Sequence, residues 1–218
     1  MTDTPHRPVP RVRAERSDGK RSRAAILEQA AQLATMEGIE GLSIARLAAA
    51  VGMSKSGLFA HFGSKEELQL ATIDRATTFF EESVTTPAAV AEHGLERLRL
   101  LADGYLDYIE ADTFAGGCFF ASVLSEVDTR PGAVRDRLVA FLHDWLARLD
   151  TTIREAQADG TIDPAEDPAQ LAFEIEAALF LANAQYVVVH TSEPIDRGRA
   201  AIARRLAAAR TKPRRSRS

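Results

Sequence analysis

The chain has 218 residues, of which 45% are hydrophobic, and it carries a formal net charge of −4. This length suffices for one large or two small domains with a sizeable buried core. The single cysteine, Cys118, excludes an intramolecular disulfide. Because the sequence shows no apolar segment near its N-terminus and no run of ~18 apolar residues, we expect neither secretion nor membrane insertion, and we expect a cytoplasmic protein.

The charge is distributed unevenly along the chain. Residues 1–65 contain ten lysines and arginines against six aspartates and glutamates, whereas residues 66–209 contain twelve against twenty-five. Residues 210–218 add five basic groups and no acid. A basic N-terminal part on an acidic body would turn that part toward phosphate groups. Chance variation among solvated charges is the alternative explanation.

The N-terminal residues 1–19 contain three prolines and scattered arginines but few large apolar groups. We therefore expect a disordered basic arm, which either adds attraction to phosphates or is inert. The first helix is predicted over residues 20–37, with an apolar stripe that includes Ile26 and Leu33. Gly38 follows its end.

Residues 43–62 predict two short helices separated by a tight break. Gly52 ends the first helix, because glycine adopts the left-handed conformation without strain. Ser54 is suited to cap the second helix. The apolar side of that helix is expected to consist of Leu58, Phe59 and Phe62. A short helix with small polar residues and one lysine at its N-terminal end suits a DNA major groove.

This stretch resembles the DNA-binding domain of the tetracycline-repressor (TetR) family of transcriptional regulators. The family pattern combines an A-x-x-x-G-V-S turn, a short recognition helix and H-F-x-[ST]-K-E-x-L; here it stands as LAAAVGMSKSGLFAHFGSKEEL, residues 47–68. The similarity is close over residues 20–70 and holds only in outline beyond them. Phe59 stands where the family often has a tyrosine that contacts a phosphate, so the resemblance does not imply that contact here. A helix-turn-helix used only for packing is the alternative.

The resemblance implies sequence-specific binding to double-stranded DNA. Gly57 would let the backbone approach the DNA closely, and His61 and Lys65 would bind phosphates, which position a protein without carrying sequence information. The predicted DNA contacts are Ser43, Arg46, Ser54, Lys55, Ser56, Gly57, His61 and Lys65.

The rest of the chain predicts a bundle of six helices. They are expected at about 65–83, 92–110, 118–127, 132–159, 168–190 and 194–209. The first of them starts with Ser64 as a cap and Glu67 at the capping-box position. It connects the DNA-binding part with the body, and we expect it to be the only element that couples the two.

The helix expected over residues 168–190 is apolar nearly all round. One stripe includes Leu171 and Ala182, and another includes Phe173 and Phe180. A helix of this kind is buried on both sides, so we predict that it forms a homodimer interface together with the last helix. The family dimerises in this way, on near-palindromic operators. The exchange Ala182→Arg should then yield monomers. A single thick core is the alternative.

No catalytic or metal-binding pattern stands out in the sequence. It lacks HExxH, paired CxxC, Gly-x-Ser-x-Gly and a phosphate-binding loop, and its five histidines are dispersed. We therefore expect no enzyme activity, no cofactor and no metal. Cys118 is predicted to be a buried apolar group, with a redox-sensing thiol as the alternative.

A small-molecule site in the body is plausible, since apolar walls with few polar groups are typical of such sites. Core packing would place the same residues inside the bundle. The predicted ligand-binding residues are Tyr105, Phe120, Phe141, Trp145, Phe173, Phe180 and Asn183.

The sequence thus predicts an all-α protein with a three-helix DNA-binding head and a six-helix body. The expected parts are a disordered basic arm (1–19), a helix-turn-helix domain (20–65), a ligand-binding and dimerisation domain (66–210) and a disordered basic tail (211–218). The expected function is that of a transcriptional regulator, a repressor released by a small apolar or aromatic ligand of unknown identity. A ligand-binding helical protein or an enzyme without a DNA-binding role is the alternative.

Overall fold

The computed structural model describes residues 12–127 and 131–211, and its regular elements there are helices, so the predicted all-α class is confirmed. The elements are α1 (Val12–Glu37), α2 (Ile44–Ala50), α3 (Lys55–Phe62), α4 (Lys65–Phe80), the π-helical turn η1 (Glu81–Thr85), α5 (Thr86–Ala88), α6 (Gly94–Glu110), α7 (Phe119–Val127), α8 (Ala133–Ala158), α9 (Pro168–Val189) and α10 (Glu193–Ala209).

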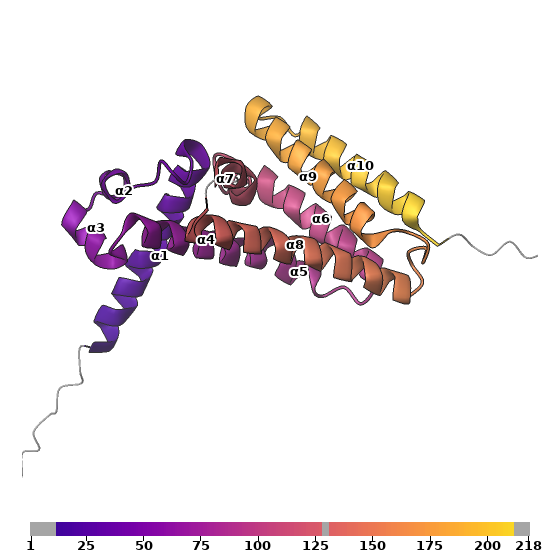
Figure 1. The fold of residues 1–218 in the computed structure, drawn as a ribbon, viewed down its shortest axis with the longest axis horizontal. Helices are drawn as coiled ribbons and strands as arrows, with labels where there is room; N and C mark the ends of the chain where they lie inside the picture. Colours follow the sequence, from indigo (N-terminus) through magenta and orange to yellow (C-terminus); the bar gives the residue numbers. More distant parts are fainter. Residues whose placement is uncertain (1–11, 128–130, 212–218) are drawn as a thin grey trace, which may run out of the picture.

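Helices α1, α2 and α3 form a small head at one end of the molecule (Figure 1). The tight break between α2 and α3 has the predicted chemistry. Gly52 adopts a positive φ of 67° after α2, and the Ser54 hydroxyl caps α3 by accepting the Gly57 backbone N–H at 3.1 Å. Leu47 and Leu58 are fully buried between the helices. The head is therefore held by its own small apolar core.

The predicted ends of two helices need correction. Helix α1 begins at Val12 instead of residue 20, so residues 12–19, which we expected to be disordered, are helical. The rest of the predicted arm (residues 1–11) and residues 212–218 of the tail lie outside the described residues. The helix that was predicted to end near Ser83 is longer. After α4 ends at Phe80, one π-helical turn follows and the chain stays helical as far as Ala88. Pro87 lies in α5, one residue before this helical run ends at Ala88.

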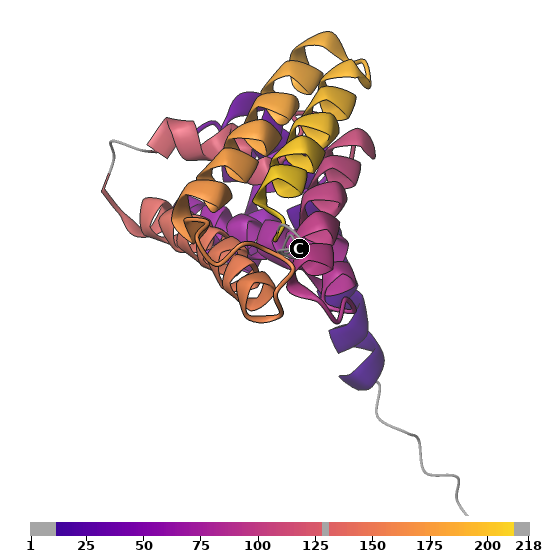
Figure 2. The same cartoon turned by 90° about the vertical axis from the view of Figure 1, so that its right-hand side faces the viewer.

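The body is a bundle in which α6 contacts α8, α9 and α10 (Figures 1 and 2). Helix α4 leaves the head, enters the body and packs against α8 and η1. Its C-terminal residue Phe80 is buried in the core together with Leu106, Phe119 and Leu149. One helix thus belongs to both parts of the molecule.

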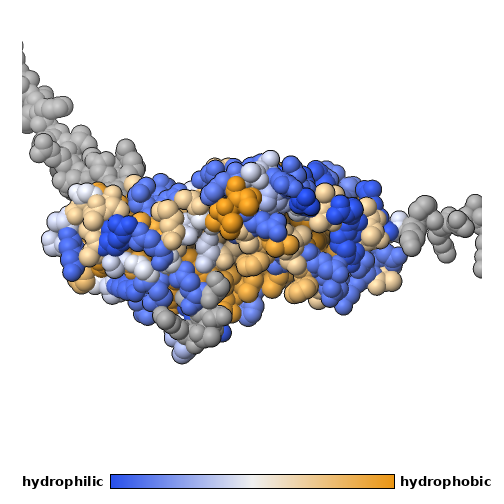
Figure 3. Space-filling model, turned by 90° about the horizontal axis from the view of Figure 1, so that it is seen from above, coloured by the Kyte–Doolittle hydropathy of each residue, from blue (hydrophilic) through white to orange (hydrophobic). Residues whose placement is uncertain are grey.

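Helix α9 has the predicted two apolar sides, but they differ in burial. Leu171 and Leu179 are fully buried against the body, whereas Phe173 and Leu181 are 67% and 57% exposed. By length and composition α9 would also fit a membrane span. It contacts α6, α7, α8 and α10 within the bundle, so one of its two apolar sides is covered there. Seen from the side of α9, apolar side chains gather in the middle of the molecule (Figure 3).

Candidate functional site

Helix α3 presents the outer surface of the head. Leu58 and Phe62 are buried beneath it, and Lys55 and Ser56 are exposed at its first turn. Within the described part of the chain, Lys55 makes no ion pair. The hydroxyls of Ser54 and Ser56 lie 3.3 Å apart. The start of the helix therefore offers a free cation, two hydroxyls and the N–H groups of a helix N-terminus to an anion.

Phe59 does not lie on the apolar underside of α3, as we had predicted. Its side chain is 54% exposed on the outer surface of the head. The spacing explains the error, because residues 58 and 62 are one helical turn apart and share a face, whereas position 59 is rotated away from them. An exposed phenylalanine on this helix is available for contact with a partner.

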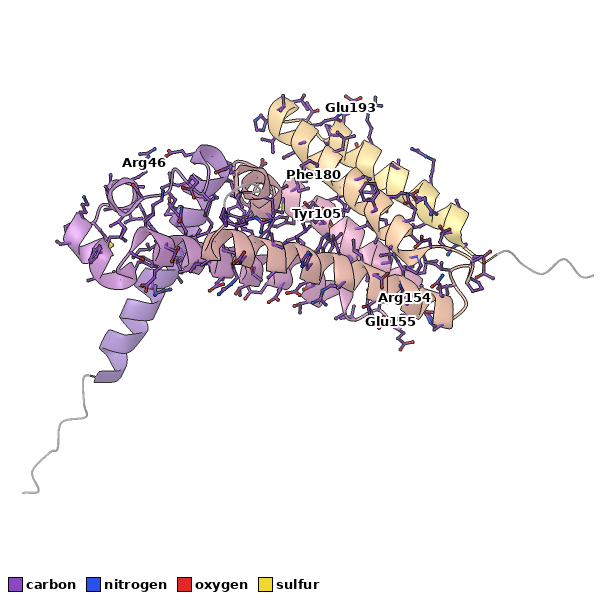
Figure 4. The ribbon with its side chains drawn as sticks, viewed as in Figure 1. Arg46, Tyr105, Arg154, Glu155, Phe180 and Glu193 are labelled. Atoms are coloured by element: carbon purple, nitrogen blue, oxygen red, sulfur yellow. The ribbon has the colours of Figure 1, made fainter. Side chains whose placement is uncertain are left out.

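Several predicted DNA contacts also have structural partners inside the head. Ser43 caps α2 by accepting the Arg46 backbone N–H at 3.2 Å. The Arg46 guanidinium lies at the edge of the head (Figure 4) and donates from Nε to both carboxylate oxygens of Glu37, at 3.1 and 2.9 Å. This hydrogen bonding holds the pKa of Glu37 below its ordinary value.

Lys65 and His61 are held in a similar way. Lys65 Nζ donates to the Glu40 carbonyl oxygen at 2.7 Å and thereby braces the turn between α1 and α2. The His61 ring is half-buried beside Phe62, with ring centroids 6.2 Å apart. Gly57 is half-buried, and a Cβ placed on it would meet the Ser54 hydroxyl at 3.0 Å. At these positions a DNA contact would have to coexist with a packing role.

The aromatic residues of the body surround one ring, that of Phe80. Its centroid lies 5.2 Å from Phe141, 5.3 Å from Trp145, 5.7 Å from Tyr105 and 6.1 Å from Phe120, with the rings mostly edge to face. Four predicted ligand-binding residues are thus brought together. Phe80 was missing from that set, although it lies on the helix that was expected to link head and body.

A cavity of about 250 Å³ opens beside this aromatic cluster, between α4, η1 and α8. Phe80, Phe141 and Trp145 form its apolar wall. The charged residues around it are Asp74, Glu81, Asp144, Arg137 and Arg148, and Arg137 is ion-paired with Asp74. The cavity therefore combines aromatic walls with a rim that has no surplus of positive charge.

Glu176 is a polar group of the cluster that the sequence analysis missed. Its Oε2 accepts the Trp145 indole N–H at 2.6 Å. Burial raises the pKa of Glu176 above its ordinary value, and the indole hydrogen bond offsets only part of that rise. Tyr105 lies inside the bundle (Figure 4), where burial and the nearby Cys118 and Glu176 raise its pKa. Burial likewise raises the pKa of the Cys118 thiol, which disfavours the reactive thiolate.

Five of the seven predicted ligand-binding residues do not line this cavity. Tyr105 and Phe120 lie in the aromatic cluster next to it. Phe173 and Phe180 are 67% and 47% exposed on the outer stripe of α9, so their assignment to an internal site is corrected. Asn183 is buried on α9, but its Oδ1 already accepts the Cys118 backbone N–H at 2.8 Å. Helical periodicity placed these residues on α9 and could not show what lies next to each face.

The outer side of α9 and the adjoining part of α10 form an open apolar groove of about 760 Å³. Leu181, Ala184 and Val188 line it from α9, and Pro194 and Ala201 line it from α10. Ala182 lies at the bottom of this groove and is only 3% exposed, because it packs against Gly198 of α10. The exchange Ala182→Arg would therefore disturb the fold of a single subunit, and it is not the clean test of dimerisation that we had expected.

Helix α4 is not the only connection between head and body. Helix α1 contacts α7, and Glu126 of α7 accepts backbone N–H groups from Ile39 and Glu40, in the turn that follows α1. Partial burial raises the pKa of Glu126. Before that turn, in the last part of α1, Gln32 and Thr35 bond to the turn between α6 and α7. The prediction of a single coupling helix is therefore wrong.

The helix-turn-helix head, the helical body and the aromatic cavity define a class: an all-helical, ligand-responsive DNA-binding regulator. Residues 26–72 match the family model of the bacterial regulatory proteins of the tetR family, and residues 94–202 match that of the tetracyclin repressor-like C-terminal domain. The chain therefore belongs to the TetR family of transcriptional regulators.

Individual relatives agree with this assignment. The transcriptional regulator AcuR of Cereibacter sphaeroides is 25% identical over 179 residues, which cover 79% of this chain and 81% of AcuR. A TetR regulator from Chloroflexus aurantiacus superimposes with a TM-score of 0.80 at 28% identity, covering 88% of this chain and 96% of that one. AibR, solved with isovaleryl coenzyme A and operator DNA, matches with a TM-score of 0.67 at 25% identity, covering 84% and 97%.

Proposed function

We propose that the protein represses transcription as a homodimer in which each α3 enters the major groove of one operator half-site. The observation that carries this proposal is the outer surface of α3, where Lys55, Ser56 and Phe59 are exposed above a buried apolar core. A helix of this kind fits the major groove. Lys55 would bind a phosphate, and the hydroxyls of Ser54 and Ser56 would bond to phosphates or base edges. Ser43, Arg46, Gly57, His61 and Lys65 would complete the contact surface.

Dimerisation would use the outer sides of α9 and α10. The uncovered stripe of α9 includes Phe173, Phe180, Leu181 and Val188, each at least 47% exposed in the single chain. Two copies related by a two-fold axis would pack these helices into a four-helix interface. The two recognition helices would then fit half-sites about 34–36 Å apart on a near-palindromic operator.

The effector would bind in the cavity beside Phe80, Phe141 and Trp145. Its walls favour an apolar or aromatic molecule. AibR is a relative that binds an acyl coenzyme A, but in this chain the rim carries three carboxylates and two guanidinium groups. Those charges provide no net attraction for the phosphates of coenzyme A, so we favour an uncharged effector. We propose further that the protein acts in the cytoplasm and catalyses no reaction, as is typical of its family.

The DNA-binding part is tested with the DNA upstream of the protein's own gene. In fluorescence anisotropy, the wild type should bind with two subunits per operator, in preference to unrelated DNA of equal length. Lys55→Ala should weaken this binding, whereas Arg154→Ala, on α8 and far from the head (Figure 4), should not. The proposal would be overturned if the wild type bound the upstream DNA no more tightly than unrelated DNA.

The effector part is tested through Trp145, the only tryptophan in the chain. Candidate ligands are titrated against free and operator-bound protein while its fluorescence is recorded. Because coupling is reciprocal, an inducer must bind the operator-bound protein more weakly, by the factor by which it weakens operator binding. Equal affinity in both states would exclude induction by that ligand.

A further inference from the structure

We propose that the turn formed by residues 111–118, between α6 and α7, fixes the orientation of the head on the body, and that Gln32 and Asn183 are positioning residues for operator binding. This inference rests on the proposed function above. The turn contacts α1 on one side and α9 on the other, so it joins the DNA-binding head to the helix that would form the dimer interface (Figure 1).

On the head side, the side-chain amide of Gln32 bonds to two backbone groups of the turn. Its Nε2 donates to the Thr113 carbonyl oxygen, and its Oε1 accepts the Ala115 N–H at 3.1 Å. Thr35 lies one helical turn farther along α1, and its hydroxyl accepts the Gly116 N–H at 3.3 Å. A donor and an acceptor used together fix the direction of the turn as well as its distance from α1.

On the body side, two other residues of the turn, Cys118 and Asp112, are held by α9. The Cys118 N–H donates to Asn183 Oδ1 at 2.8 Å, in a buried position. Tyr186, about one helical turn beyond Asn183, donates its hydroxyl to Asp112 Oδ1 at 2.9 Å. Helices α1 and α9 are therefore linked through the same short segment of backbone, with residues 115 and 116 bonded to α1 and residue 118 to α9.

The two glycines of the turn make this close approach possible. A Cβ on Gly116 would overlap the backbone of Thr35, and a Cβ on Gly117 would overlap the side chains of Asn183 and Val187. Gly117 also has a φ of 77°, which disfavours other residues. From sequence this glycine pair appeared only as a break between helices; its packing on both sides shows that the turn is a fixed spacer.

The turn also reaches the aromatic cluster of the body. Phe114 is buried, and its ring centroid lies 5.7 Å from that of Phe79 and 6.2 Å from that of Tyr108. Phe79 precedes Phe80, which lines the proposed effector cavity. A displacement at the cavity or in α9 would therefore reach the head through this turn as well as through α4. In a dimer, the turn would help to set the separation of the two recognition helices.

The test compares operators whose two half-sites are moved apart or together by one and two base pairs. We expect the wild type to prefer one spacing strongly. Gln32→Ala and Asn183→Ala should each lower affinity at that spacing by about tenfold and reduce the preference among spacings, while affinity for a single half-site stays unchanged. Gln29→Ala, an exposed glutamine on the same helix, is the matched control and should behave as the wild type does.

A second measurement detects the head orientation without DNA. Because Cys118 is buried, a spin label on Ala49→Cys, exposed on α2, would mark each head of the dimer. The distance distribution between labels should be narrow for the wild-type background and broader with Gln32→Ala or with the more conservative Gln32→Glu. An unchanged distribution and an unchanged spacing preference in the folded variants would overturn the inference. Failure of the wild type to bind any DNA would instead count against the proposed function.

Discussion

At the scale of single residues, Lys55 and Lys65 have different surroundings, and the difference is measurable. Lys55 is exposed at the start of α3, whereas Lys65 donates to the Glu40 carbonyl oxygen at 2.7 Å. Each alanine exchange should flatten the salt dependence of operator binding by about one unit of slope per lost phosphate contact. Only Lys65→Ala should also lower the melting temperature. Anisotropy over a salt series and thermal unfolding measure the two effects. If neither variant changed the slope of the salt dependence, these lysines would not contact DNA phosphates.

An exchange at Phe59 is expected to increase the affinity for operator DNA. It is 54% exposed where the family often has tyrosine, so Phe59→Tyr adds a hydroxyl to the outer surface of α3 without disturbing the core. A hydrogen bond to a phosphate should strengthen operator binding by about 1 kcal/mol, or about fivefold in Kd. The melting temperature of the free protein serves as the control and should not change. Equal or weaker binding by the variant would mean that position 59 faces no phosphate in this complex.

Glu176 predicts a dependence of stability on pH. Burial raises its pKa in the folded protein above the ordinary 4.5. As pH rises, the carboxyl group therefore loses its proton at a lower pH in the unfolded chain than in the folded protein. Stability conferred by the protonated form is therefore present in acid and is lost as pH rises through the folded pKa. Glu176→Gln, which can still accept the Trp145 indole N–H, should melt at a higher temperature than the wild type at pH 7, with the difference shrinking toward pH 4.

The control for that experiment is the neighbouring Glu174. Its pKa is lowered by hydrogen bonds from Gln170 and Arg205, so Glu174→Gln should lower the melting temperature at pH 7. A Glu176→Gln variant with the same pH dependence as the wild type would show that this carboxylate is solvated.

At the scale of elements, the outer stripe of α9 carries the proposed dimer. Leu181 is 57% exposed there and lines the groove, so Leu181→Arg should place a charge in the interface without disturbing the core of one subunit. Sedimentation should show monomers at micromolar concentration and anisotropy a large loss of operator affinity. Ala147→Arg, on the exposed side of α8, is the control. Leu181→Arg dimers as stable as the wild type would locate the interface elsewhere.

Local sequence signals predicted the elements well for a physical reason. Ser54 and Ser64 each cap a helix by accepting a backbone N–H three residues on, as their positions had indicated, and Ser43 caps α2 in the same way. Such bonds depend only on neighbouring residues. Periodicity also identified both apolar sides of α9, but it could not show that one side is uncovered, and so Phe173 and Phe180 were assigned to an interior site.

The residues missed from sequence act through partners far along the chain. Gln32 bonds to a backbone position 83 residues away, and Glu176 to a side chain 31 residues away. Neither residue has a local signal, since a glutamine on a helix surface and a glutamate on an apolar helix have many uses. The tertiary contacts alone distinguish them.

At the scale of the whole molecule, the head and the body are connected at several places, among them the contact of α7 with the end of α1. Helix α4 runs from the head into the aromatic cluster, and the turn of residues 111–118 lies between α1 and α9. An effector that changes a mostly bound population from 99:1 to 1:99 must favour the non-binding state by about 5.5 kcal/mol. Together these connections would hold the heads at one separation until a ligand displaces them. The acidic body would meanwhile be repelled by DNA and leave the head as the contact surface.

The most direct measurement is selection of DNA from a random pool by the purified full chain at physiological salt. The sequences recovered should contain a near-palindrome whose half-sites are centred about 34–36 Å apart, and protein carrying Lys55→Ala or Leu181→Arg should recover it much more weakly. Recovery of no common sequence, or of single half-sites bound equally well by the wild type and Leu181→Arg, would contradict the account of a dimer that places two α3 helices in adjacent major grooves.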